Sequence, residues 1–116
     1  MGYESKIFIV NVISAKDFRY ADEIATVDMS KMGYGNGWRE LFKSPIDFKV
    51  WYRGEEIDTD CYDEHLKSAD YNDVIVWLKN YMRDNEYYRR VPVLLGILNG
   101  INPNDWDNLK IVHYGY

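Results

Sequence analysis

Six carboxylates fall within ten residues near the middle of this 116-residue chain, and no Lys or Arg interrupts them. They are Glu55, Glu56, Asp58, Asp60, Asp63 and Glu64. Spaced carboxylates can imitate a row of phosphates, because a groove of Lys and Arg responds mainly to charge and geometry. The run therefore predicts an acidic docking surface for a basic partner, such as the nucleic-acid channel of an enzyme. The alternative is an ordinary solvated face, which is what most charge runs are.

The same run contains side chains that could hold a hard metal ion. The oxygen ligands would come from Asp58, Asp60, Asp63 and Glu64, and the neighbouring His65 offers a nitrogen. His113 would join only if the last strand lay beside this segment. The run lacks the turn glycine and the distal bidentate acid of a calcium loop, and zinc sites assemble Cys and His at characteristic spacings. We therefore expect no metal or other cofactor, and a small metal-dependent enzyme is the third alternative.

No catalytic set is visible in the sequence. Cys61 with either histidine would be a nucleophile and base, but the acidic neighbours of Cys61 disfavour the reactive thiolate. No serine stands in a recognisable triad setting. We therefore expect a protein without enzymatic activity.

A glycine-rich stretch offers a different chemistry. Gly33, Gly35 and Gly37 follow an expected strand and precede an expected helical turn, where backbone N–H groups can hold a phosphate, and Arg39 would add a positive charge. The spacing matches neither a dinucleotide-binding fingerprint nor a P-loop, and tight-turn glycines explain the stretch equally well. The second functional alternative is thus a ligand-binding module, for example a sponge for a nucleotide signal.

Tyr88, Arg89 and Arg90 lie between two expected helices, where complete burial is difficult. Tyrosine and arginine are typical interface anchors, because each offers a large contact area with a polar end. We predict that these three residues anchor a protein partner. Ordinary amphipathic packing is the alternative.

The strands that position these residues follow from hydrophobic periodicity. Apolar residues on both parities predict a strand over 6–13 that is covered on both faces, and looser alternation predicts another over 22–29. Clear alternation over 47–53 predicts a strand that turns near 53–56 into a hairpin. Alternation over 109–114 predicts a closing strand.

Two helices are expected between these strands. Apolar residues at helical spacing predict the first from about Asp70 to Arg83. The second runs from about Tyr87 to Asn99, or starts nearer Val91 because proline at position 92 fits only a first turn, and it stops at Gly100. This order predicts a single α+β domain over 1–116, with an antiparallel or mixed sheet of about four to five strands packed by both helices.

Composition excludes several classes of function. The 14 Lys and Arg against 19 Asp and Glu, a net charge of −5, leave no surplus for neutralising phosphates, so we expect no direct nucleic-acid binding. The longest apolar stretch, over 91–101, is far shorter than the roughly 20 residues of a membrane helix. The start has no convincing secretory signal, and the single cysteine makes no internal disulfide, so we expect a cytoplasmic protein.

Four short sequence segments together carry a resemblance to a known group of proteins. They are Tyr3-Glu4-Ser5-Lys6-Ile7, Lys31-Met32-Gly33-Tyr34-Gly35, Tyr88-Arg89-Arg90 and Ile111-Val112-His113-Tyr114-Gly115-Tyr116. Over nearly its whole length the chain resembles small accessory proteins of phages and prophages of Gram-positive bacteria. These segments are not catalytic motifs, and no activity carries over onto their residues. The resemblance implies a context, the cytoplasm of an infected or lysogenic bacterium, where acidic single-domain proteins often block defence enzymes, CRISPR nucleases among them.

The leading hypothesis is therefore a non-enzymatic phage protein that binds and inhibits a host defence protein, most concretely a CRISPR–Cas effector. The acidic run would dock it, and Tyr88, Arg89 and Arg90 would anchor it. The expected partner is a host protein that itself binds nucleic acid. The sequence leaves a homodimer open.

Overall fold

The computed structural model describes residues 4–29, 37–84 and 88–115. Its first element is an antiparallel hairpin of β1 (Ser5–Ser14) and β2 (Arg19–Asp28), closed where the Ala15 N–H donates to the Phe18 carbonyl at 2.8 Å. Side chains on both faces of β1 are buried, as its sequence predicts, whereas most of β2 is exposed or half-buried. β1 is therefore an interior strand and β2 lies at an edge.

The main sheet has five antiparallel strands in the order β2-β1-β7-β6-β3, which confirms the predicted α+β class. The closing strand β7 (Leu109–Gly115) pairs with β1 on one side and with β6 (Lys67–Ala69) on the other. The far edge is β3 (Ser44–Pro45). Hydrophobic periodicity predicts neither β3 nor β6, because strands of two or three residues are too short to show alternation.

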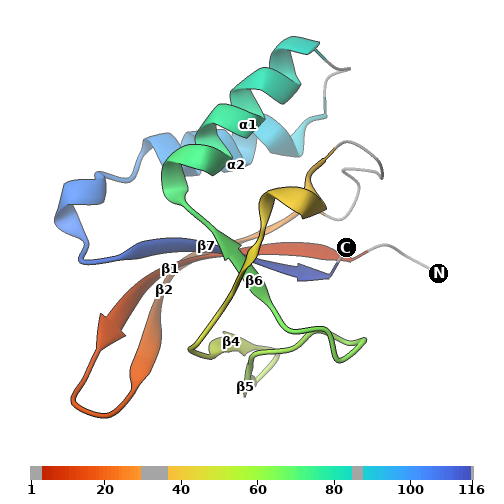
Figure 1. Ribbon diagram of the computed structural model, residues 1–116. Coiled ribbons are helices and arrows are strands. Elements are labelled where there is room, and N and C mark those ends of the chain that lie inside the picture. Colours follow the sequence, from red (N-terminus) through yellow and green to blue (C-terminus); the bar gives the residue numbers. More distant parts are fainter. Residues whose placement is uncertain (1–3, 30–36, 85–87, 116) are drawn as a thin grey trace.

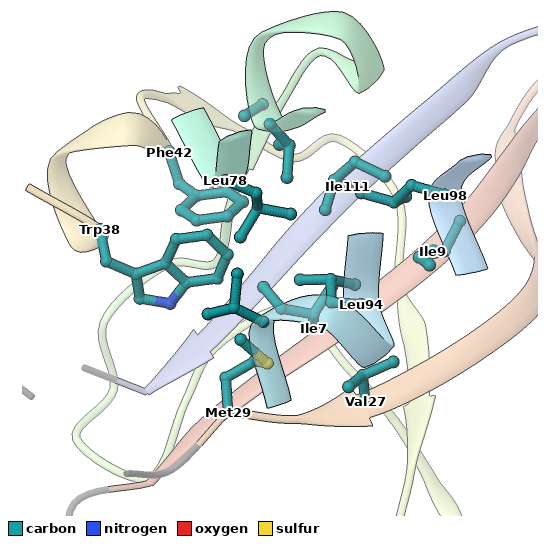
Figure 2. Packing of buried hydrophobic residues seen from close by; sticks show 13 residues of the cluster. Ile7, Ile9, Val27, Met29, Trp38, Phe42, Leu78, Leu94, Leu98 and Ile111 are labelled. Atoms are coloured by element: carbon teal, nitrogen blue, oxygen red, sulfur yellow. The ribbon is translucent and has the colours of Figure 1, made fainter. Parts of the chain in front are cut away.

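Both predicted helices cover one face of this sheet (Figure 1). They are α1 (Tyr71–Asp84) and α2 (Arg90–Asn99), so proline at position 92 falls in the first turn of α2 as expected. Ile7 and Ile111 from the sheet and Leu94 from α2 belong to the same buried core, and Trp38 lies at one end of it (Figure 2). Within the described residues, neither helix has the length and apolar character needed to cross a membrane.

The other face of the sheet is covered by a small hairpin of β4 (Val50–Tyr52) and β5 (Glu55–Ile57) (Figure 1). Its turn is at Arg53 and Gly54, both with positive φ (52° and 83°), the backbone conformation that favours a tight two-residue hairpin turn. A second core lies beneath it, and its buried members are Phe8, Val10, Val12, Ile46, Phe48, Val50, Leu66, Val112 and Tyr114. Helices, sheet and hairpin thus form three layers.

Candidate functional site

The acidic run forms β5 and the loop that follows it, and we call residues 55–64 the acidic arm. Glu55 and Glu56 are exposed in β5, and Asp63 and Glu64 are exposed in the loop. The side chains of Asp58 and Asp60 are half-buried. The arm lies in the hairpin layer, on the side of the sheet away from the helices (Figure 1).

Across the described ranges, none of the six carboxylates of the arm takes part in an ion pair. The acids elsewhere that do so are Glu4 with Arg53, Asp28 with Lys6 and Arg90, Asp47 with Arg19, and Asp70 with Lys110. Cations of the chain therefore form ion pairs with carboxylates in other parts of the described structure and with none of those in the arm. The arm presents its negative charge to solvent.

The loop of the arm has a defined shape, and Asp60 provides it. The Asp60 Oδ1 atom accepts hydrogen bonds from the backbone N–H groups of Tyr62 (2.8 Å) and Glu64 (3.1 Å), and the Asp60 N–H donates to the Glu64 carbonyl at 2.9 Å. Asp63 adopts a positive φ of 60°, which an aspartate tolerates better than most residues. Asp60 thus acts mainly as the structural centre of the loop, and the other acids carry its outward charge.

The base of the arm is fixed to the edge of the main sheet. His65 Nε2 donates to the Ile46 carbonyl at 2.8 Å, and the Leu66 N–H donates to the Asp58 carbonyl at 2.8 Å. One ring nitrogen of His65 is therefore occupied by a hydrogen bond within the fold. In the described residues, no three His, Cys, Asp or Glu side chains gather where they could hold a metal ion, so the metal-site alternative finds no support in this part of the chain.

Tyr52 attaches the hairpin to the sheet. Its hydroxyl donates to Glu4 Oε1 at 2.8 Å, and its ring lies 4.8 Å from the Tyr114 ring and edge-on to Phe8 at 5.7 Å. Burial raises the pKa of Tyr52, and the hydrogen bond to Glu4 adds to the shift. Arg53 also donates to Glu4 Oε1 at 3.2 Å, so one carboxylate ties two hairpin residues to the sheet.

Large aromatic side chains are exposed around the arm. Trp51 is 56% exposed and pairs directly across the hairpin with Glu56, and Tyr62 is 52% exposed in the loop. Phe18 and Tyr20 are also exposed, with ring centres 5.8 Å apart. These two rings line a shallow depression of about 650 Å³ together with Glu56 and Asp58 of the arm. The sequence prediction did not include these exposed aromatic residues, although alternation over 47–53 puts Trp51 on the face of its strand opposite Val50 and Tyr52.

The predicted anchors lie elsewhere. Arg90 donates to the Asp28 carbonyl at 2.8 Å and lies 3.5 Å from Asp28 Oδ2, so its guanidinium holds α2 to β2. Tyr88 is half-buried against the helix-side core, and Arg89 is exposed. The start of α2 and the acidic arm lie on opposite faces of the sheet (Figure 1), so the structure does not bring the two predicted sets into one surface.

The glycine-rich stretch is described only in part. Gly33 and Gly35 lie outside the described residues, Gly37 has a positive φ of 85°, and Arg39 is exposed in the short 3-10 helix η1 (Arg39–Leu41). Arg39 lines a groove of about 440 Å³ between η1 and the acidic arm. Its charged lining residues are Arg39, Lys43 and Lys67 and the acids Glu40, Asp60 and Glu64. Because the two signs balance, the groove does not concentrate positive charge for a phosphate.

A buried polar group that the sequence did not reveal includes His113, which also lines this groove. Ser5 Oγ is 2.9 Å from His113 Nε2 and accepts a hydrogen bond from Trp38 Nε1 at 3.2 Å. The ring of Phe42 stacks on His113, with centres 5.0 Å apart. Ser5 is only 4% exposed, so its hydroxyl is a core hydrogen-bonding group and is not open to a substrate.

Comparison with protein-family models, with curated proteins and with solved structures finds no match for this chain. The resemblance to phage accessory proteins therefore stays a prediction from the sequence segments alone.

Proposed function

We propose that this protein binds a host protein with a basic surface through the acidic arm and blocks that surface. The most concrete partner is a CRISPR–Cas effector, whose nucleic-acid channel is rich in Lys and Arg. One observation carries the proposal: in the described structure the arm has six carboxylates without an ion pair, flanked by exposed aromatic rings.

The charges and the rings have different tasks in this proposal. Exposed carboxylates attract a basic surface over a distance of about one Debye length, roughly 8 Å at physiological salt, and they set the association rate and the orientation. They contribute less to the final affinity, because each carboxylate must lose water when it is buried. The acidic arm is thus the steering element.

Trp51 and Tyr62 supply the contact area that charge alone lacks. Large aromatic side chains that become buried at the centre of an interface are the residues most often found to dominate binding energy. Trp51 lies directly opposite Glu56, so a partner that contacts one also contacts the other. We expect the aromatic rings to determine the dissociation rate.

The arm is also held in shape before binding. Asp60 orders the loop, and Tyr52 fixes the hairpin to the sheet through Glu4. A preordered surface loses less conformational entropy on association than a mobile one does. This supports recognition of a basic surface by an acidic surface that is already ordered.

The test is association with purified Cas nucleases from Gram-positive bacteria, measured over a salt series. We expect the wild-type protein to associate faster at low salt and to inhibit DNA cleavage. Glu55→Lys combined with Glu56→Lys should reduce the association rate about 10-fold or more at low salt and flatten its salt dependence. Trp51→Ala should mainly raise the dissociation rate.

The matched control is Asp22→Lys combined with Asp73→Lys. It makes the same change in net charge on exposed acids of β2 and α1, which have no ion pair among the described residues and lie outside the acidic arm. This control should associate at the wild-type rate per protomer. If both charge reversals slowed association equally, net charge alone would explain the effect. That result would contradict a docking role for the arm. Absence of binding to every nuclease tested at low salt would contradict the choice of partner.

A further inference from the structure

Beyond Arg89, the outer face of α2 is apolar and is exposed in the part of the chain that the structure describes. Arg89, Val93, Gly96 and Gly100 are spaced four, three and four residues apart, which places them in one line along the helix, and all four are exposed. The opposite side of α2 buries Val91, Leu94 and Leu98 against the sheet. A helix that is apolar on all sides is normally buried on all sides. Val93, Gly96 and Gly100 are therefore not buried by any of the described residues.

Nothing among the described residues requires a glycine at position 96. It lies inside α2, its φ is not positive, and a Cβ atom placed on it would meet no described atom within 4 Å. Glycine inside a helix destabilises that helix relative to alanine. What glycine does offer at an exposed helix position is a flat surface, on which a second helix can approach the backbone closely.

We propose that α2 packs antiparallel against α2 of a second copy of this chain, across a two-fold axis near Gly96. The charges at the two ends of α2 support a second copy of the chain as the partner. Arg89 is exposed at the start of α2, and Asp105 and Asp107 are exposed just after its carboxyl end, beside the short helix η2 (Pro103–Asp105). None of these three side chains has an ion-pair partner among the described residues.

An antiparallel pair brings Arg89 of each copy to the carboxyl end of the other copy's α2. There it meets the negative end of the helix dipole and the two acidic side chains. Because a two-fold interface uses the same patch twice, the complementary contact forms at both ends of the pair. A parallel arrangement would place Arg89 against Arg89, which opposes it.

The position of α2 also suits self-association of an acidic chain. The acidic arm lies on the other face of the sheet, so two copies joined through α2 keep their uncompensated carboxylates far apart (Figure 1). Both arms stay available in such a dimer. The inference does not depend on the proposed function of the arm.

The test is the mass of the full-length protein in solution, measured by sedimentation equilibrium over a concentration series. We expect a dimer for the wild type. Val93→Glu and Gly96→Leu should each weaken the dimer at least 10-fold, the first by placing charge on the apolar line and the second by keeping the helices apart. Val76→Glu is the matched control, since Val76 on α1 is 57% exposed and Val93 is 54% exposed.

A charge exchange tests the orientation separately. Arg89→Glu should weaken the dimer, and adding Asp105→Arg and Asp107→Arg in the same chain should restore it. Circular dichroism of each variant shows whether it is folded. A wild-type protein that is monomeric at all concentrations would overturn the proposal, as would a dimer that Val93→Glu leaves intact. Failure of the charge exchange to restore the dimer would overturn the antiparallel arrangement.

Discussion

Ser5 and His113 lie 108 residues apart in the chain, yet their Oγ and Nε2 atoms are 2.9 Å apart in the core. Trp38 Nε1 donates to the same Ser5 oxygen. An indole N–H can only donate, so Ser5 Oγ accepts from Trp38 while it also bonds to His113 Nε2. One hydroxyl thus links the first strand, the last strand and the segment leading into η1.

Removing this hydroxyl should destabilise the fold. We expect Ser5→Ala to lower the free energy of unfolding by about 1–3 kcal/mol, because two buried polar groups each lose a partner. Urea unfolding followed by tryptophan fluorescence measures the change. Ser14→Ala, at the exposed end of the same strand, is the control and should stay within about 0.5 kcal/mol of the wild type. Equal effects of the two substitutions would show that the buried hydroxyl contributes nothing.

Asp60 should control the order of the acidic arm without controlling the fold. Asp60→Ala removes the acceptor of two backbone N–H groups, so we expect amide hydrogen exchange at Tyr62 and Glu64 to accelerate at least 10-fold. Glu64→Ala is the control, because the Glu64 side chain is exposed and forms no described hydrogen bond. Unchanged exchange in Asp60→Ala would mean that the loop is held by other contacts.

The buried tyrosine at the end of β7 predicts a loss of stability at alkaline pH. Burial raises the pKa of Tyr114 to about 12, and the nearby Cys61, Glu4 and Tyr52 add to the shift. A tyrosine in the unfolded chain titrates near pH 10, so between about pH 10 and 12 the unfolded state releases a proton that the folded state keeps. The contribution of the protonated Tyr114 hydroxyl to the free energy of unfolding is therefore complete below pH 10, and it is lost as the pH rises toward 12.

Urea unfolding at a series of pH values checks this prediction. We expect the unfolding midpoint of the wild type to fall more steeply above pH 10 than that of Tyr114→Phe, which has no proton to release at that position. Tyr62→Phe changes an exposed tyrosine and should keep the wild-type slope. A Tyr114→Phe slope equal to that of the wild type would assign the alkaline loss to other groups.

Much of the fold could be predicted because its signals are local. The two-faced burial of β1, the turn at Arg53 and Gly54, and the limits of both helices each depend on residues close together in the sequence. Backbone propensity and side-chain periodicity act over that same range. The acidic run was visible for the same reason, since its members are neighbours in the chain.

The contacts between these elements were decided only by tertiary packing. The pairing of β6 with β7, the contact of Ser5 with His113 and the commitment of Arg90 to Asp28 all join distant segments. No local pattern specifies such contacts. They form because segments far apart in the sequence bury their apolar side chains in the same core. The same packing placed Trp51 beside the acidic arm and the start of α2 on the opposite face, so the sequence by itself determined the charge of the candidate site, and the tertiary structure decided its neighbours.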